Sequence, residues 1–219
     1  MPTTDHPFDG RPSWRVTRTL TDGTPVTIRP VTPEDREELR AGIAALSPAS
    51  RYFRFLQLQG PPSDELLDYL VHVDQKTHVA IGAEIVSPDL KTTRGVGVAR
   101  FIRLEDNIAE AAVTVADDMH RRGVATVLLA ELLRAAEVRG IERFRAEIAA
   151  DNASMRTILD RAGAKQVEDL GSAITYELAL NPSHTATFYE VLKDAAESKA
   201  AWLTRHALPM VAQASRLLR

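Results

Sequence analysis

The chain has 219 residues, 30 acidic and 27 basic side chains, a net charge of −3 and no cysteine. The length suits one domain with a full core, the charge argues against a nucleic-acid partner, and the lack of cysteine excludes disulfides, a thiol nucleophile and thiolate metal ligands. The histidines show no metal-ligand spacing, no apolar run approaches the roughly 20 residues of a membrane span, and no signal-peptide core is present, so we expect a cytoplasmic protein with no metal and no membrane partner.

The first half of the chain begins with an arm and a hairpin. Residues 1–15 hold three prolines and few apolar anchors, which predicts a flexible N-terminal arm. Two runs of β-prone residues, 15–20 and 26–31, flank Asp22-Gly23, a pair that is typical of hairpin turns. Capping residues and helical spacing then predict three helices, at 32–46, 50–59 and 63–73.

The second half alternates strands with helices. Periods of two and of 3.6 residues predict strands at 78–86, 95–104, 109–115, 144–149, 165–167 and 173–180, and helices at 124–139 and 152–162. A helix joins strand 109–115 to strand 144–149, so these two strands should be parallel neighbours. The predicted fold class is therefore α/β, a mixed central sheet with helices on both faces.

The C-terminal part has a different character. Asn181-Pro182-Ser183 marks a stop, and residues 183–219 read as a helical extension that Pro209 interrupts. The extension would pack back on the domain, form a contact in a homodimer, or act as a lid. Its mixed charges do not suggest a membrane helix.

The loop between strand 109–115 and helix 124–139 carries the strongest functional signal, and its sequence is His120-Arg121-Arg122-Gly123-Val124-Ala125-Thr126. Unpaired N–H groups at a helix N-terminus, the helix dipole and two guanidinium groups together favour a phosphate. Gly123 allows close approach of the backbone to an anion. Thr126 would donate to a phosphate oxygen or simply cap the helix, and Asp117 and Asp118 would orient the loop.

This loop resembles the acetyl-CoA-binding motif of the GNAT acetyltransferases: glutamine or arginine, two residues, glycine, one residue, then glycine or alanine. His120 departs from the pattern at the first position, and Gly123 and Ala125 match it. The resemblance extends over the order of elements and implies a GNAT domain at 16–182 that uses acetyl-CoA. It also implies that the backbone at Val113, Thr114 and Val115 binds the cofactor and the oxyanion.

A second block is similar to a later motif of the same family. Asn152 opens the helix at 152–162, and the resemblance implies that it faces the pantetheine arm of acetyl-CoA. A plain helix N-cap is the alternative role for Asn152, and both roles can coexist. Many members carry a tyrosine four residues before Gly163 that protonates the leaving thiolate; here that position is Leu159, so the resemblance gives no general acid.

Glu110 is the predicted general base. It lies five residues before Val115 on a strand, about 16 Å away, which is comparable to the reach of an extended pantetheine arm. Its apolar neighbours should desolvate the carboxylate, and family members with a glutamate at this place use it as the base. Glu84 and Glu105 are the alternatives, and a salt-bridge partner or exposed edge residue is the structural alternative for Glu110.

These features predict an N-acetyltransferase that transfers the acetyl group of acetyl-CoA directly to a primary amine. A protein lysine is favoured because the segment 50–55 is similar to that of bacterial protein-lysine acetyltransferases, and because acids of the helix at 63–73 would attract an ammonium group. A small-molecule amine acetyltransferase and a catalytically weak acyl-CoA-binding sensor remain alternatives. Another phosphate-ligand enzyme is disfavoured, since no Walker lysine or complete dinucleotide fingerprint exists.

Overall fold

The computed structural model describes residues 14–55, 60–86 and 92–197. The strands are β1 (Val16–Thr19), β2 (Pro25–Pro30), β3 (His78–Val86), β4 (Thr93–Glu105), β5 (Ile108–Val115), β6 (Arg143–Ala149), β7 (Lys165–Asp169) and β8 (Ala173–Ala179). The helices are α1 (Arg36–Ala45), α2 (Pro48–Phe55), α3 (Asp64–Val71), α4 (Val124–Val138), α5 (Ala153–Arg161) and α6 (Pro182–Glu197), with short 3-10 turns η1 (Pro33–Asp35) and η2 (Asp117–Met119).

The strands form one eight-stranded sheet in the order β1-β2-β3-β4-β5-β6-β8-β7. All neighbouring pairs are antiparallel except β5 and β6, which are parallel. The predicted parallel pair is therefore confirmed, and α4 is the helix that makes the crossover between its strands.

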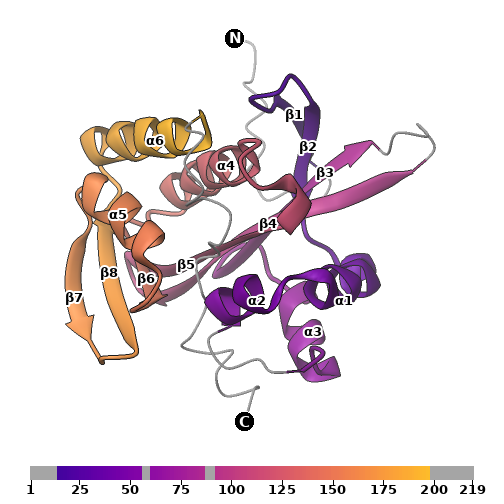
Figure 1. The fold of residues 1–219 in the computed structure, drawn as a ribbon, viewed down its shortest axis with the longest axis horizontal. Helices are drawn as coiled ribbons and strands as arrows, with labels where there is room; N and C mark the ends of the chain where they lie inside the picture. Colours follow the sequence, from indigo (N-terminus) through magenta and orange to yellow (C-terminus); the bar gives the residue numbers. More distant parts are fainter. Residues whose placement is uncertain (1–13, 56–59, 87–91, 198–219) are drawn as a thin grey trace.

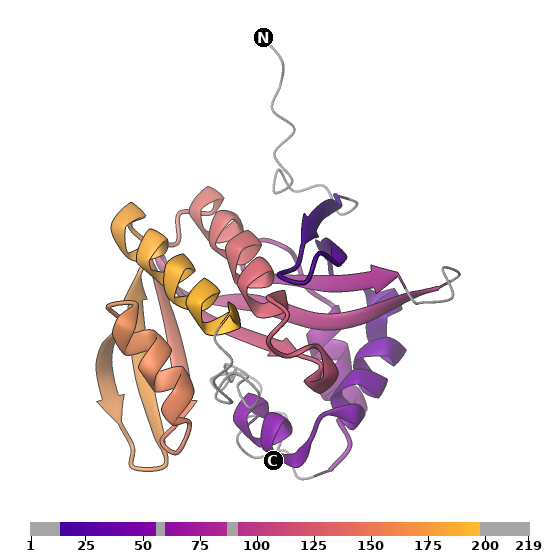
Figure 2. The same cartoon turned by 45° about the horizontal axis from the view of Figure 1, so that its top comes forward.

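Helices cover both faces of this sheet, as predicted (Figure 1). On one face, α1 and α3 bury Ile43, Leu66 and Leu70 against Ile102 and Ala112. On the other face, α4, α5 and α6 share the larger core with residues from most strands. Figure 2 shows α6 lying beside α4 on that second face. The mixed sheet thus separates the hydrophobic core under α1 and α3 from the core under α4, α5 and α6.

Local signals explain where several elements begin. The backbone N–H of Thr32 donates to the Asp35 carboxylate at 2.8 Å, so the acid in the first turn reaches back to the capping residue. Gly23 has a φ of +85° in the β1–β2 turn, a conformation that glycine adopts without steric cost. The predicted hairpin and the predicted first helix therefore both form where their turn and capping residues stand.

The described part of the C-terminal extension packs on the domain. Phe188, Val191 and Leu192 of α6 are buried in the core that α4 and α5 share. The Tyr189 hydroxyl donates to the carbonyl of Ala130 at 2.9 Å. Three predictions lie outside the described residues: the arm up to residue 13, the last part of the helix expected at 50–59, and the helical extension beyond residue 197.

Candidate functional site

The sheet opens at its centre, between β5 and β6. The two strands pair only over Ile108–Glu110 and Arg143–Arg145. Beyond these residues β5 pairs with β4 and β6 pairs with β8, without further β5–β6 ladder pairs in the described chain. The opening is therefore a wedge lined by the backbone of residues 111–115 on one side and 146–149 on the other, and Glu110 stands at its closed end.

Glu110 lies on the β5 face that α2 and α3 cover. Residues 110, 112 and 114 share this face because side chains alternate along a strand, and Ala112 packs in the α1–α3 core. Glu110 itself is only 5% exposed. Burial lowers the pKa of Arg54 to about 10 and raises the pKa of Tyr69 to about 12, and the charge of Glu110 opposes the first shift and adds to the second. A buried carboxylate thus faces α2 and α3 from the end of the wedge.

The loop before α4 contains two residues with positive φ and packs against the β1–β2 turn. Gly123 precedes the helix with a φ of +87°, and Arg121 also has a positive φ of 62°. A Cβ built on Gly123 would lie 3.1 Å from the Thr21 methyl group. The backbone N–H of Thr21 donates to the carbonyl of Arg122 at 3.1 Å, which ties the loop to the β1–β2 turn. The N-terminal turn of α4, with Val124 and Ala125, follows directly.

The structure separates the four side chains predicted to bind phosphate. Arg122 donates to Asp22 at 2.6 Å and to Thr24 at 2.8 Å, so its guanidinium holds the β1–β2 turn. The His120 ring lies 3.0 Å from the carbonyl of Val115, and Thr126 donates to the carbonyl of Leu192 at 3.3 Å. Arg121 is exposed and makes no ion pair with a described residue. Of the two arginines in this loop, Arg121 is therefore the one whose side chain can reach a phosphate group that binds from solution.

Asp117 and Asp118 anchor the loop to two distant elements. Asp117 accepts a 2.6 Å hydrogen bond from the backbone N–H of Ser47 and a 2.5 Å bond from the Ser50 hydroxyl at the start of α2. Asp118 accepts two hydrogen bonds from Arg94, at 2.6 and 2.8 Å. Both acids therefore orient the loop, as expected, but through α2 and β4. No local sequence pattern signals the Asp117 contact, because its donors lie about 70 residues earlier in the chain.

Asn152 caps α5 and keeps one donor unused. Its Oδ1 atom accepts from the backbone N–H of Met155 at 3.1 Å. Its Nδ2 atom is buried and has no hydrogen-bond partner. This orphaned amide fits a carbonyl of a pantetheine arm, while Leu159 is buried in the core and offers no proton.

The two alternative bases are less suitable. Glu84 accepts from Arg15 at 2.5 Å and from Arg29 at 2.8 Å, so it would have to give up both ion pairs to take a proton. Glu105 is exposed at the end of β4, with its carboxylate 4.0 Å from Arg145. Glu110 is thus the base candidate that is both buried and located at the wedge.

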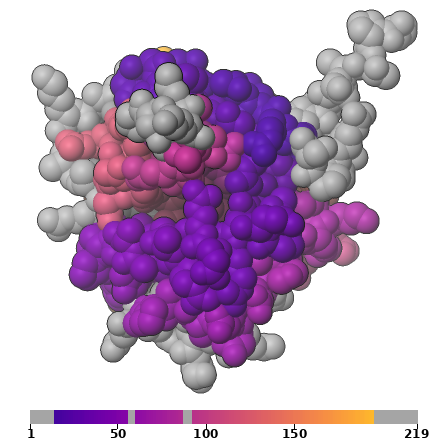
Figure 3. Space-filling model, turned by 90° about the vertical axis from the view of Figure 1, so that its right-hand side faces the viewer, coloured from indigo at the N-terminus to yellow at the C-terminus, as the bar shows by residue number. Residues whose placement is uncertain are grey.

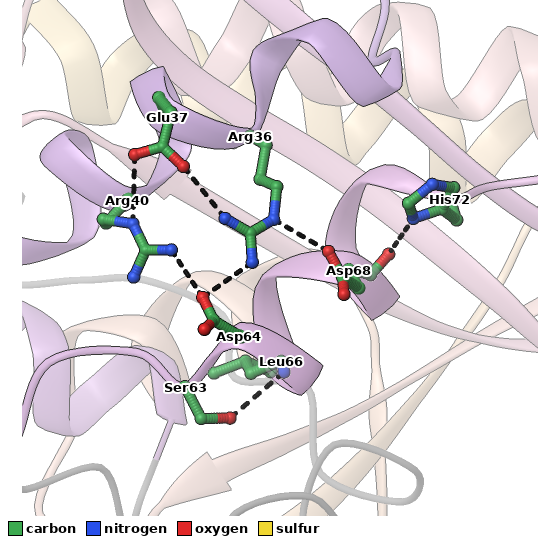
Figure 4. A network of polar contacts seen from close by, with 8 residues as sticks. All are labelled: Arg36, Glu37, Arg40, Ser63, Asp64, Leu66, Asp68 and His72. Carbon is green, nitrogen blue, oxygen red and sulfur yellow. Dashed lines mark hydrogen bonds and ion pairs between the residues drawn. The ribbon is translucent and has the colours of Figure 1, made fainter.

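Two of the three acids of α3, Asp64 and Asp68, form ion pairs within the protein (Figure 4). Arg36 donates to Asp64 at 2.6 Å and to Asp68 at 2.8 Å. Arg40 also reaches Asp64, at 2.6 Å. The sequence interpretation that these two aspartates attract a lysine ammonium is therefore weakened, because the α1 arginines already neutralise them.

Two buried arginines near Glu110 were missed by sequence reasoning. Arg54 of α2 is 4% exposed and Arg100 of β4 is 2% exposed. A charged residue inside the apolar run Val98 to Ile102 was the available signal for Arg100, because charged side chains are rarely fully buried without a role.

No cluster of three or more potential metal ligands occurs among the residues that the structure describes, and no helix in that part is long and apolar enough to cross a membrane.

Comparison with known proteins adds independent information. The family model for an acetyltransferase (GNAT) domain matches residues 26–165. "Acetyltransferase Pat" of Mycolicibacterium smegmatis is 36% identical over 177 residues, covering 76% of this chain and 49% of the relative. "Acetyltransferase PA5475" of Pseudomonas aeruginosa is 36% identical over 165 residues, covering 74% of this chain and 87% of the relative.

Solved structures show the same similarity. The GNAT domain of S. lividans PAT superposes with a TM-score of 0.68 at 27% identity, over 76% of this chain and 97% of that one. A cAMP-binding acyltransferase from Mycobacterium smegmatis gives a TM-score of 0.52 at 27% identity, over 84% of this chain and 56% of that one. The chain thus spans about half the length of both mycobacterial relatives.

Proposed function

The chain belongs to the GNAT acetyltransferase family, and from this premise we propose that it transfers the acetyl group of acetyl-CoA to the side-chain amine of protein lysines. The observation that carries the proposal is the wedge between β5 and β6, with a buried glutamate at its closed end and a glycine-started helix beyond its open end. Acetyl-CoA would lie with its pyrophosphate at residues 120–126 and its pantetheine arm along residues 113–115. Asn152 would donate to that arm from the other side.

The residues around the wedge supply two parts of the reaction. Glu110 takes a proton from the acceptor ammonium, directly or through water, and leaves a neutral amine. The amine nitrogen attacks the thioester carbonyl carbon, and backbone N–H groups of residues 113–115 stabilise the oxyanion. The C–N bond forms, the C–S bond breaks, and the thiolate takes its proton from water or from the amine nitrogen, because Leu159 has none to give.

The choice of protein lysine as the acceptor rests on the similarity of this chain to named relatives. Two relatives carry the name Pat or PAT, an acetyltransferase of M. smegmatis and a GNAT domain of S. lividans, and the chain covers 97% of the latter. The α1–α3 layer over Glu110 is the surface through which an acceptor would reach the base. A small-molecule amine is the second candidate acceptor.

The substitution Glu110→Gln tests the base. It keeps the size of the side chain and removes the basic carboxylate, so kcat/KM should fall by roughly 10²–10⁴. Acetyl-CoA affinity measured by calorimetry should remain close to that of the unsubstituted protein, because the proposed contacts to the cofactor lie elsewhere. Asp68→Asn, on the exposed α1–α3 network, serves as a matched control for loss of a carboxylate.

The assay combines acetyl-CoA with a lysate and, separately, with a panel of small amines. Site-specific lysine acetylation that disappears in Glu110→Gln supports the proposal. Turnover confined to small amines would show that the acceptor is a small amine and not a protein lysine. Tight acetyl-CoA binding without turnover on either panel would favour the acyl-CoA-binding sensor.

A further inference from the structure

A cavity of about 110 Å³ lies between α1 and the central strands. This is several times the roughly 10–15 Å³ that a single water molecule needs. Most of its wall is apolar, and Arg54, Arg100 and Thr114 are among the charged and polar residues that line it. Figure 3 views the molecule from the α1 side and shows the surface hollowed beside the violet atoms of the N-terminal helices.

Three polar atoms of these lining residues are buried without a hydrogen-bond partner. They are Arg54 Nη1, Arg100 Nε and Thr114 Oγ1. Arg54 and Arg100 are 4% and 2% exposed, so bulk solvent reaches little of either side chain. Buried donors without acceptors are rare in folded proteins, and each costs free energy. Three such donors lining one cavity indicate an acceptor group that binds there.

The charges around the two guanidinium groups do not balance. Burial is the main cause that lowers the pKa of Arg54 to about 10, and the Glu110 carboxylate opposes that shift. Burial and the charge of Arg54 lower the pKa of Arg100 to about 9. Arg100 Nη1 lies 3.1 Å from the carbonyl of Leu70 and 3.1 Å from the His78 ring. His78 is a neutral acceptor because burial lowers its pKa to about 3. Arg54 and Arg100 are therefore two buried cations close enough for Arg54 to disfavour the charge of Arg100, and the Glu110 carboxylate acts on Arg54.

The other carboxylates of the cavity are committed elsewhere. Asp35 and Glu84 are both bound by Arg29, at 2.7 and 2.8 Å. Glu38 accepts from the backbone N–H of Gly95 at 2.6 Å. Gly95 lies five residues from Arg100 along β4, about 16 Å away, so Glu38 marks the opposite end of the cavity. The end near Arg54 and Arg100 remains cationic.

We propose that this end of the cavity binds a carboxylate, with Arg54, Arg100 and Thr114 as its donors. Arginine N–H groups match a carboxylate in charge and in geometry, and apolar walls exclude competing water. Thr114 lies on the stretch of β5 where the thioester is placed, so the assignment rests on the proposed function. The carboxylate belongs either to the acyl group of the donor, as in succinyl-CoA, or to an acceptor that is an amino acid.

The donor arm of the test compares succinyl-CoA with butyryl-CoA, which has a methyl group in place of the carboxylate. Calorimetry measures binding of both donors without need for turnover. If the carboxylate is on the acyl group, succinyl-CoA should bind about tenfold more tightly than butyryl-CoA. In Arg54→Met and in Arg100→Met this ratio should fall to about one. Arg161→Met removes an exposed guanidinium of α5 and should preserve the ratio.

The acceptor arm uses acetyl-CoA with leucine and with leucinamide. If the carboxylate is on the acceptor, kcat/KM should be about tenfold higher for leucine, and the two arginine variants should lose that preference. Circular dichroism and melting temperature identify variants that fail to fold, and Arg54→Lys offers a second variant that keeps the charge but removes the guanidinium donors.

Equal values for the charged and uncharged members of both pairs in the unsubstituted protein would overturn the carboxylate site. A preference that survives in folded Arg54→Met, Arg54→Lys and Arg100→Met would also overturn it. Neither result touches the proposed function, which is tested separately by acetyl transfer to protein lysines. Conversely, tighter binding of succinyl-CoA than of butyryl-CoA would support the carboxylate site even if the protein showed no acetyl transfer.

Discussion

Arg121 and Arg122 are adjacent in sequence but differ in what their side chains contact. Arg122 is held by Asp22, Thr24 and the sulfur of Met119, and Arg121 is exposed. From the sequence, both arginines are predicted to bind phosphate, because two adjacent arginines before a helix cannot be told apart by their position. The hairpin that engages Arg122 lies about 100 residues earlier in the chain, so only the folded structure shows the difference.

We expect Arg121→Ala to weaken acetyl-CoA binding about tenfold, because a hydrogen-bonded guanidinium–phosphate contact is lost. The salt dependence of the dissociation constant should decrease as well. Arg122→Ala should mainly lower the melting temperature by a few degrees, because the ion pair with Asp22 is partly exposed and contributes about 0–1 kcal/mol. Calorimetry and thermal unfolding separate the two effects. A larger loss of affinity in Arg122→Ala than in Arg121→Ala would contradict this assignment.

His78 should make stability depend on pH. Burial and the charge of Arg100 lower the pKa of His78 from 6.5 to about 3 in the folded state. As the pH falls below about 6.5, the unfolded chain takes up a proton that the folded chain does not, so stability is lost over the range from 6.5 toward 3.

Between pH 7 and pH 5 the expected loss in the free energy of unfolding is about 1–2 kcal/mol. His78→Gln keeps an acceptor for Arg100 and should flatten this slope in urea unfolding experiments. His72→Gln, at a more exposed histidine outside this buried group, is the control. An unchanged slope in His78→Gln would show that another group causes the pH dependence.

At the scale of elements, most of the fold follows from sequence patterns. The strand His78–Val86 has the predicted bounds, and the parallel pair β5–β6 follows from the helical crossover between the strands. The point where these strands diverge has no local signal, because it depends on β6 turning to pair with β8. The cavity over β4 is equally hidden, since α1 and α2 reach it from a distant part of the chain.

Gly97 holds α4 close to the sheet. A Cβ at this position would lie 2.9 Å from Leu128 Cδ1 and 2.9 Å from the carbonyl oxygen of Thr114. Gly97→Ala should therefore cost about 1–3 kcal/mol and lower activity, because β5 must shift at Thr114. Gly42→Ala, on α1, meets no atom within 4 Å and should stabilise the protein by about 0.5–1 kcal/mol. Equal melting temperatures for the two variants would show that the α4–β4 contact yields easily.

On the scale of the whole molecule, the two cores have different tasks. The core beneath α4, α5 and α6 holds α4, whose N-terminus follows the loop proposed to bind the cofactor. The layer of α1, α2 and α3 encloses Glu110 and the cavity with its buried arginines. Asp117 connects the loop to the start of α2, which belongs to the second layer, and Asp118 connects it to β4. The loop proposed to bind the cofactor and the layer proposed to admit the acceptor are therefore joined by hydrogen bonds.

The packing of α6 predicts that this helix is part of the folded domain. Phe188 is 3% exposed against α4 and α5, so it forms part of the larger core. Phe188→Ala should cost about 3–5 kcal/mol and should also weaken acetyl-CoA binding, because α4 loses support. Glu190→Ala, at an exposed position of the same helix, should change stability by less than about 0.5 kcal/mol. Chemical unfolding measures both variants. A cost below about 1 kcal/mol for Phe188→Ala would mean that α6 is an appendage, and that the catalytic domain ends before Pro182.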